Sequence, residues 1–266
     1  MNLKILFFGD ISGRIGRNAV TKILPSLKKK LDPDLVIANA ENIAHGVGIT
    51  EKTLQELSDA GVNFFTSGDH VFDKKEVVGI LEDKKTPLIR PANFPPSVPG
   101  VGAKLFEIGT KKVLVINLIG RVFLKGNYDC PFRKADEILD EFKNENLSAV
   151  IVDFHAEATS EKNGLAQYLD GRVSAVFGTH THIGTDDWQI LPGGTAFVTD
   201  IGMVGAKDSI LGVDKKGILR TFLSQIPEVH EIPEEGICTV NAIYFEIDPK
   251  TKQAKKIKKI KEEIKI

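Results

Sequence analysis

The sequence of 266 residues predicts an α/β fold. Short apolar runs alternate with amphipathic helical patterns along most of the chain, which is the order that builds parallel sheets flanked by helices. Acidic, amide and imidazole side chains follow several of these runs, and open α/β sheets gather their ligands at such strand ends. Hydrophobic residues make up 42% of the chain, enough for a packed core. Because no repeat or linker interrupts the pattern, we predict a single domain over residues 1–266.

The spacing of apolar residues assigns the elements of the first part of the chain. A buried strand is predicted at 3–8, and a helix at 16–30 with Val20, Ile23, Leu24 and Leu27 on one face. A second strand follows at 35–38. Thr50 is placed to cap a helix that Gly61 ends. A third strand at 62–65 and a helix at 72–81 complete this part.

The later elements are less regular. Five prolines between Pro87 and Gly102 predict a long irregular loop, and a hairpin follows at 105–108 and 113–118. Helices are predicted at 134–142 and 161–169, with strands at 149–154, 173–177 and 195–198. The apolar run 242–247 and the lysine-rich tail 252–266 predict a closing hairpin. We therefore expect a largely parallel sheet early in the chain and more antiparallel pairing later.

Composition excludes several classes of protein. The formal net charge of −1 gives no basic field for long nucleic acid or an anionic membrane. The lysine-rich tail is better explained as a protected edge strand than as a nucleic-acid tail. No apolar run reaches the ~20 residues of a membrane helix, and the apolar start is too short for a signal peptide. These features predict a cytoplasmic protein, and its two cysteines form no disulfide framework.

The most informative stretch is Gly178-Thr179-His180-Thr181-His182, which places two imidazoles just after a predicted strand. Four further strand ends also carry polar side chains suited to metals. These residues are Asp10, Asn39, Glu41, Asn42, Asp69, His70, Asp153, His155 and Glu157. Carboxylate oxygens and imidazole nitrogens without thiolates suit iron, manganese or zinc. A bridging carboxylate such as Glu41 could hold two ions that activate water and clamp a phosphoryl group.

Each residue also has an ordinary structural explanation. Asp10 could cap the helix that follows it, and Asn42 could stabilise a turn. His155 could be a hydrogen-bonded core histidine. Because five strand ends carry such residues together, we favour a metal site over five independent structural roles.

Several long motifs resemble the YmdB-type metallophosphoesterases. The motifs are GDISGR at 9–14, NAENIAHG at 39–46, RPANFP at 90–95, DCPFR at 129–133, DFHAEATSEK at 153–162 and GTHTH at 178–182, together with TDIGM at 199–203 and SILGV at 209–213. The resemblance covers nearly the whole chain. It implies a four-layer α/β/β/α sandwich, a dinuclear site that commonly holds iron, and a homo-oligomer. It also implies hydrolysis of 2′,3′-cyclic nucleotide monophosphates to 3′-monophosphates.

The resemblance assigns roles to the residues of the motifs. Asp10, Glu41, Asn42 and His182 would hold the first metal, and Glu41 would bridge. Asp69, His155 and His180 would complete the second metal site. A hydroxide between the metals would attack phosphorus, with His70 as the general acid. His45 and Asn93 are weaker candidates for substrate contacts.

One position departs from the family pattern, which usually has Gly-Asn-His where this chain has Gly68-Asp69-His70. An aspartate adds a negative charge to the site, so we expect tight metal binding but some repulsion of phosphate. Two alternatives therefore stay open. One is another phosphoesterase, such as a phosphomonoesterase or nuclease. The other is a metal-binding regulatory protein with weak activity because of Asp69.

Overall fold

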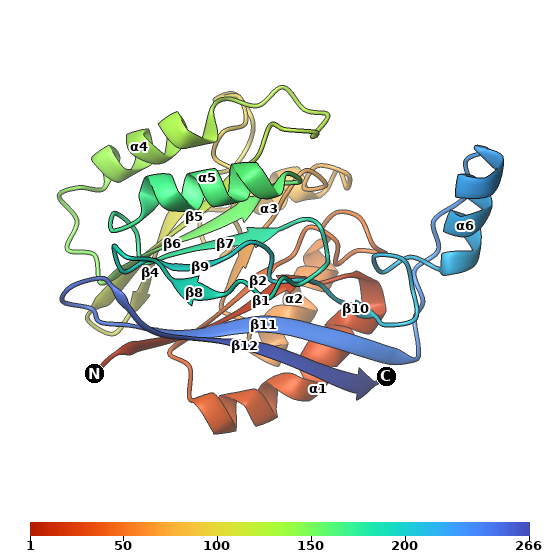
Figure 1. Cartoon of the computed structure of the whole chain (residues 1–266), viewed down its shortest axis with the longest axis horizontal. Coiled ribbons are helices and arrows are strands. Elements are labelled where there is room, and N and C mark those ends of the chain that lie inside the picture. Colours follow the sequence, from red (N-terminus) through yellow and green to blue (C-terminus); the bar gives the residue numbers. More distant parts are fainter.

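The computed structural model describes residues 1–266 as two β-sheets of six strands each, stacked face to face with helices on both outer faces (Figure 1). This arrangement confirms the four-layer α/β/β/α sandwich.

The first sheet has the strand order β10-β11-β1-β2-β3, with β12 paired to β11. Its strands are β1 (Leu3–Asp10), β2 (Leu35–Asn39), β3 (Phe64–Thr66), β10 (Val204–Ala206), β11 (Ile237–Ile247) and β12 (Ala254–Lys265). Strands β1, β2 and β3 are parallel, whereas β11 is antiparallel to β1, β10 and β12. The closing hairpin predicted from the lysine-rich tail is confirmed, and β12 ends the sheet at this side.

The second sheet has the order β4-β5-β6-β7-β9-β8. Its strands are β4 (Ala103–Ile108), β5 (Lys111–Ile119), β6 (Ala149–His155), β7 (Ala175–Thr179), β8 (Gln189–Ile190) and β9 (Ala196–Val198). Strands β5, β6, β7 and β9 are parallel, and only the edge strands β4 and β8 pair antiparallel. The expectation of antiparallel pairing late in the chain is therefore wrong for this sheet, because helices connect β5 to β6 and β6 to β7.

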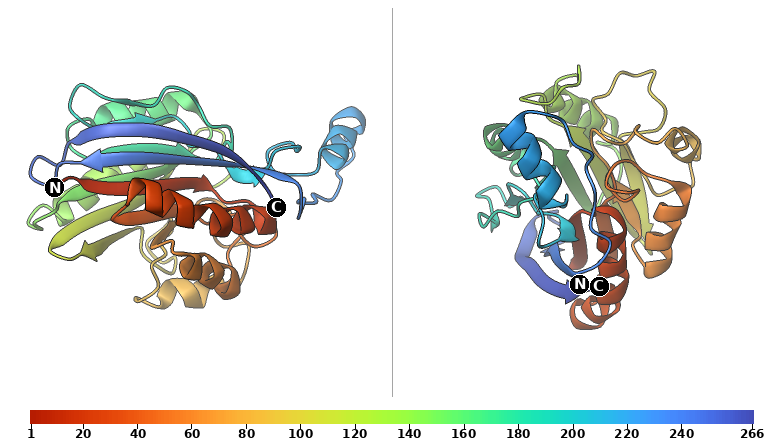
Figure 2. Two further views of the ribbon diagram at one scale, coloured as in Figure 1. Left: turned by 90° about the horizontal axis from the view of Figure 1, so that it is seen from below. Right: turned by 90° about the vertical axis from the view of Figure 1, so that its right-hand side faces the viewer.

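Five helices cover the two sheets, and a sixth does not. The outer face of the first sheet carries α1 (Gly13–Leu31), α2 (Glu51–Ala60) and α3 (Val77–Glu82), and that of the second carries α4 (Pro131–Glu141) and α5 (Thr159–Leu169) (Figures 1 and 2). Helix α6 (Lys215–Ser224) buries none of its residues and projects from the sandwich (Figure 2). None of the helices combines the length and apolar character needed to cross a bilayer.

The core consists of three layers of apolar side chains, one between the sheets and one under each set of helices. Strand β1 contributes side chains to two of these layers. Ile5 and Phe7 point between the sheets, while Leu6 and Phe8 face the helices. Successive side chains of a strand point to opposite faces, so a strand buried on both sides is apolar throughout.

Two segments differ from the sequence prediction. The helix predicted at 72–81 is confined to α3, because the residues before it form turns that include a hydrogen bond from Asp73 N to His70 O of 3.1 Å. Residues 207–236, between β10 and β11, form an excursion that contains α6, which we did not predict. Its apolar residues Leu219, Phe222 and Leu223 are exposed. The helix therefore has no buried apolar face of the kind on which helix prediction depends.

The stacked sheets explain where polar residues meet. Asp10 and Asn39 end two parallel strands of the first sheet, and His155 and Thr179 end two parallel strands of the second. The side chains of Asn39 and Asp153, one from each sheet, are joined by a 3.0 Å hydrogen bond. The candidate site therefore draws on the strand ends of two sheets and not of one alone.

Replacing Phe177 with alanine should destabilise the protein by about 3–5 kcal/mol, the usual cost of removing a buried aromatic ring. Phe177 is fully buried between the sheets, and its ring centroid lies 6.0 Å from that of Phe7 and 4.9 Å from that of Phe245. Urea denaturation measures the change. Phe222→Ala is the matched control, because that ring is 72% exposed. Equal losses in the two variants would contradict this account of the core.

Candidate metal centre

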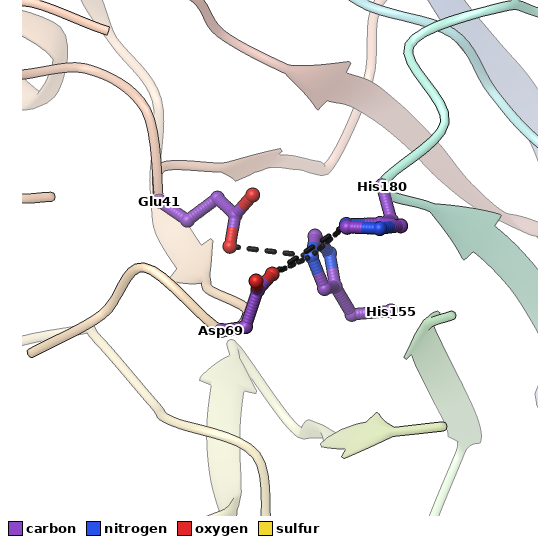
Figure 3. Close-up of side chains that lie close together, drawn as sticks. All are labelled: Glu41, Asp69, His155 and His180. Carbon is purple, nitrogen blue, oxygen red and sulfur yellow. Dashed lines mark hydrogen bonds and ion pairs between the residues drawn. The ribbon is translucent and has the colours of Figure 1, made fainter. Parts of the chain in front are cut away.

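The seven predicted metal ligands converge at one place. Potential ligand atoms of Glu41, Asp69, His155 and His180, the four side chains drawn in Figure 3, all lie within 4.8 Å of one another. Those of Asp10, Glu41 and His182 also lie within 4.8 Å of one another. Asn42 joins the second group through a contact of 3.2 Å between its Nδ2 and Nε2 of His182. Glu41 belongs to both groups, which is the arrangement a bridging carboxylate requires.

The backbone of the His180–His182 turn is unusual. Thr179 ends β7, and His180 and His182 then adopt φ angles of 96° and 65°. Residues other than glycine seldom adopt this left-handed region, and such outliers persist only where surrounding contacts enforce them. The turn brings both rings to the same site, with His180 Nδ1 at 3.0 Å from His155 Nε2.

Negative charge is concentrated here without lysine or arginine. Asp10 and Glu41 are buried, and the ion pairs of Asp10, Glu41 and Asp69 are all with histidines. Burial lowers the pKa of His155, but the nearby Glu41 and Asp69 outweigh it and hold that pKa well above its usual value. The carboxylates thus favour positive charge at this place.

Two polar atoms support metal binding directly. Oδ1 of Asp10 and Oδ1 of Asn42 are buried and have no hydrogen-bond partner. Buried polar atoms are nearly always satisfied, so an orphaned oxygen calls for a ligand. Both atoms belong to predicted ligands of the same metal, and hard oxygen donors beside imidazoles fit a divalent or trivalent ion.

The histidines use their second ring nitrogens outside the cluster. Nδ1 of His155 lies 2.9 Å from Oγ1 of Thr179, and Nε2 of His180 lies 3.1 Å from a carboxylate oxygen of Glu157. Nδ1 of His182 lies 2.8 Å from the carbonyl oxygen of Leu211. A proton held on the outer nitrogen leaves the inner nitrogen free to bind a metal.

Asp153 is linked to His155 through the hydroxyl of Thr179. Its carboxylate accepts hydrogen bonds from Oγ1 of Thr179 at 2.7 Å, from Nδ2 of Asn39 at 3.0 Å and from the hydroxyl of Thr66. Burial raises the pKa of Asp153 to about 6. The chain from His155 through Thr179 to Asp153 fixes the ring orientation. Sequence reasoning placed Asp153 at a strand end but did not identify this role.

His70 lies beside the cluster and outside both ligand groups. Its Nδ1 is 2.8 Å from Oδ2 of Asp73, and its Nε2 is 4.0 Å from Oδ2 of Asp69. Burial lowers the pKa of His70, but Glu41, Asp69 and Asp73 together raise it above its usual value. The ring is therefore suited to donate a proton from Nε2. Asp73 was missed because it lies in the segment predicted as a helix.

A buried ion pair holds the turn between the two histidines. Nζ of Lys162 lies 2.6 Å from Oδ2 of Asp200, and both side chains are 1% exposed. The same oxygen accepts hydrogen bonds from Thr181, from its backbone N at 3.2 Å and its Oγ1 at 2.8 Å. Thr181 separates His180 from His182, so this pair positions both rings. The motifs contained Lys162 and Asp200, but spacing alone did not show their contact.

A cavity of about 480 Å³ opens onto the cluster. His45 and His70 line it, together with Glu41, Asn42, His180 and His182. His230 is exposed and also lines the cavity, because residues 207–236 return past the site.

The expected substrate contact of Asn93 is not retained. This side chain is fully buried and does not line the cavity. Its Nδ2 donates to the backbone oxygens of Ile119 and Asp129, and its Oδ1 accepts from the backbone N of Ile119. Asn93 therefore joins the proline-rich loop to the end of β5.

Comparison with known proteins gives consistent results. A family model described as YmdB-like protein matches residues 6–260. The chain is 46% identical to the 2′,3′-cyclic-nucleotide 2′-phosphodiesterase of Bacillus subtilis, over 97% of this chain and 96% of the relative. A crystal structure described as a novel phosphatase of Mycoplasma pneumoniae is 36% identical with a TM-score of 0.92, covering 100% of this chain and 95% of that one. A hypothetical protein of Thermus thermophilus is 39% identical with a TM-score of 0.91, over 98% and 99%.

Lys162→Met should cost about 3–5 kcal/mol of folding free energy, because it leaves the buried carboxylate of Asp200 without its partner. The double variant Lys162→Met with Asp200→Asn should recover part of this loss. Urea denaturation compares both with Lys143→Met, which removes an exposed pair with Asp140 and should cost less than about 1 kcal/mol. A loss from Lys162→Met no larger than that control would show that the pair does not hold the turn.

Proposed function

The chain belongs to the YmdB-like family, and we propose that it is a metal-dependent phosphodiesterase that converts 2′,3′-cyclic nucleotide monophosphates to 3′-monophosphates. The observation that carries this proposal is the pair of ligand groups that share Glu41. The name of the Bacillus subtilis relative supports the choice of substrate.

The first metal would be held by Asp10, Glu41, Asn42 and His182, and the second by Glu41, Asp69, His155 and His180. The orphaned oxygens of Asp10 and Asn42 support the first assignment. Bound ions would supply water activation and neutralise phosphoryl oxygens. The donor set favours iron, with manganese and zinc as alternatives.

His70 acts as the general acid in this proposal. As hydroxide forms the new bond to phosphorus and the bond from phosphorus to the ribose 2′ oxygen breaks, His70 Nε2 gives its proton to the departing oxygen. Asp73 holds the other ring nitrogen at 2.8 Å, which orients the ring and favours its protonated form.

A small substrate is favoured over a long nucleic acid. The residues that line the cavity include no lysine or arginine. Enzymes that track nucleic acid depend on such side chains to neutralise the phosphate backbone. A regulator whose site Asp69 has weakened is an outcome of the experiments below.

Replacing His70 with alanine should lower kcat for 2′,3′-cyclic AMP by about 10²–10⁴-fold, the usual contribution of a general acid. The metal content, measured by elemental analysis, should stay that of the wild type. Bis-p-nitrophenyl phosphate is a useful second substrate, because its leaving group needs little protonation and its turnover should fall less. Loss of metal together with activity would show that His70 is a ligand instead.

Asp69→Asn tests the extra charge. We expect faster turnover of 2′,3′-cyclic AMP and weaker metal binding, because a neutral amide repels phosphate less and attracts cations less. Steady-state assays with iron, manganese and zinc compare the two proteins, and Asp140→Asn, at an exposed carboxylate paired with Lys143, is a control for charge outside the site. If neither protein turns over any cyclic nucleotide although both bind metal, the regulatory alternative is favoured.

A further inference from the structure

The excursion 207–236 builds one wall of the cavity that opens onto the candidate metal centre. Leu211 and Val213 line the cavity before α6, and His230 and Ile232 line it after the chain returns. The cavity volume of about 480 Å³ falls within the roughly 300–1,000 Å³ of pockets that bind small ligands. The space therefore extends beyond what a phosphate group alone requires.

The wall is fixed against the body of the protein by close contacts. Gly13 and Gly46 have φ angles of 61° and 89°, and a Cβ added to either would lie only 2.7 or 2.5 Å from a carbon of Ile232. Only glycine allows this approach. The backbone N of Asp214 donates to the carbonyl oxygen of Glu231 at 2.7 Å. This hydrogen bond joins the segment of the excursion that precedes α6 to the segment that follows it.

A second contact ties the wall to the metal centre itself. The carbonyl oxygen of Leu211 lies 2.8 Å from Nδ1 of His182, one of the candidate ligands. Leu211 adopts a φ angle of 54°, which is strained for a leucine and is enforced by its surroundings. The wall and the ligand group thus have a fixed relative position.

The chemistry of the wall selects a neutral, flat group. Leu211, Val213 and Ile232 offer apolar side chains, and His230 and His45 offer imidazoles that can stack on a ring or hydrogen-bond to its edge. No lysine or arginine lines the cavity, so a second phosphate would find no cationic partner. A heteroaromatic base has apolar faces and a polar edge, which match both kinds of side chain.

We propose that this wall is a nucleobase-binding subsite, with Ile232 contacting the face of the base and His230 its edge or face. The inference rests on the proposed function, because it needs the phosphate of the same molecule at the metal centre. It assigns to the excursion the recognition of the nucleoside part of the substrate. Through this contact the enzyme distinguishes a nucleotide from a simple phosphodiester.

The test compares 2′,3′-cyclic AMP with methyl β-riboside 2′,3′-cyclic phosphate, which lacks the base. The wild-type protein should prefer the nucleotide by at least about fivefold in kcat/KM, since one stacked base is worth upward of 1 kcal/mol. His230→Ala and Ile232→Ala should each reduce this selectivity ratio by at least about threefold, because each variant removes a large part of the contact with the stacked base. Phe222→Ala, on the exposed face of α6, is the matched control and should keep the ratio.

Two outcomes would overturn the subsite. One is equal kcat/KM for the two substrates in the wild type. The other is a loss in both wall variants that affects the two substrates alike. The exposed His230 keeps the test valid if Ile232→Ala disturbs folding.

Failure of the proposed function gives a different result, namely no turnover of either substrate by metal-loaded protein. In that case, calorimetric titration with 3′-AMP and with methyl β-riboside 3-phosphate measures whether the protein binds the base. Tighter binding of 3′-AMP that His230→Ala removes would support the subsite, and equal binding of the two compounds would refute it.

Discussion

The structure depends on the burial of Asp10 and Glu41 beside Asp69 with no lysine or arginine to balance them. Buried carboxylates are costly unless they are paired or bind metal. Here their partners are imidazoles, and His155 is driven toward its charged form as a result. Bound cations would balance this charge and would use the ring nitrogens for coordination.

The surrounding protein keeps this cluster in place. Each imidazole ligand uses its outer nitrogen on a different acceptor, so the three rings are oriented independently. The acceptor of His155 leads to the buried Asp153, and that of His182 belongs to the excursion. The pair of Lys162 and Asp200 holds Thr181 between two strained residues. These contacts come from elements of both sheets. Together they stabilise the unfavourable backbone conformation of His180 and His182.

Local pattern was sufficient for much of the fold. The apolar runs that became β1, β2, β6 and β7 could be recognised because those strands are buried on both faces. The helix from Thr50 to Gly61 carried a cap and a stop, and both lie where expected. Prediction failed for α6, which buries none of its residues, and for the residues from 72 to 76, which form turns before α3. The contribution of His230 to the cavity was likewise invisible, because an isolated exposed histidine has no pattern.

Residue types and their order along the chain were enough to mark the strand ends as a candidate metal site and to single out Asp69 as unusual. These properties are local, since carboxylates and imidazoles keep their chemistry wherever the chain takes them. The family resemblance implied the division of the ligands into two groups around Glu41, but their meeting in space depends on the stacking of two sheets. Only the tertiary structure showed the roles of Asp73, Asp153 and Lys162, and the wall built by residues 207–236. Contacts between residues far apart in sequence depend on packing, and no spacing along the chain encodes them.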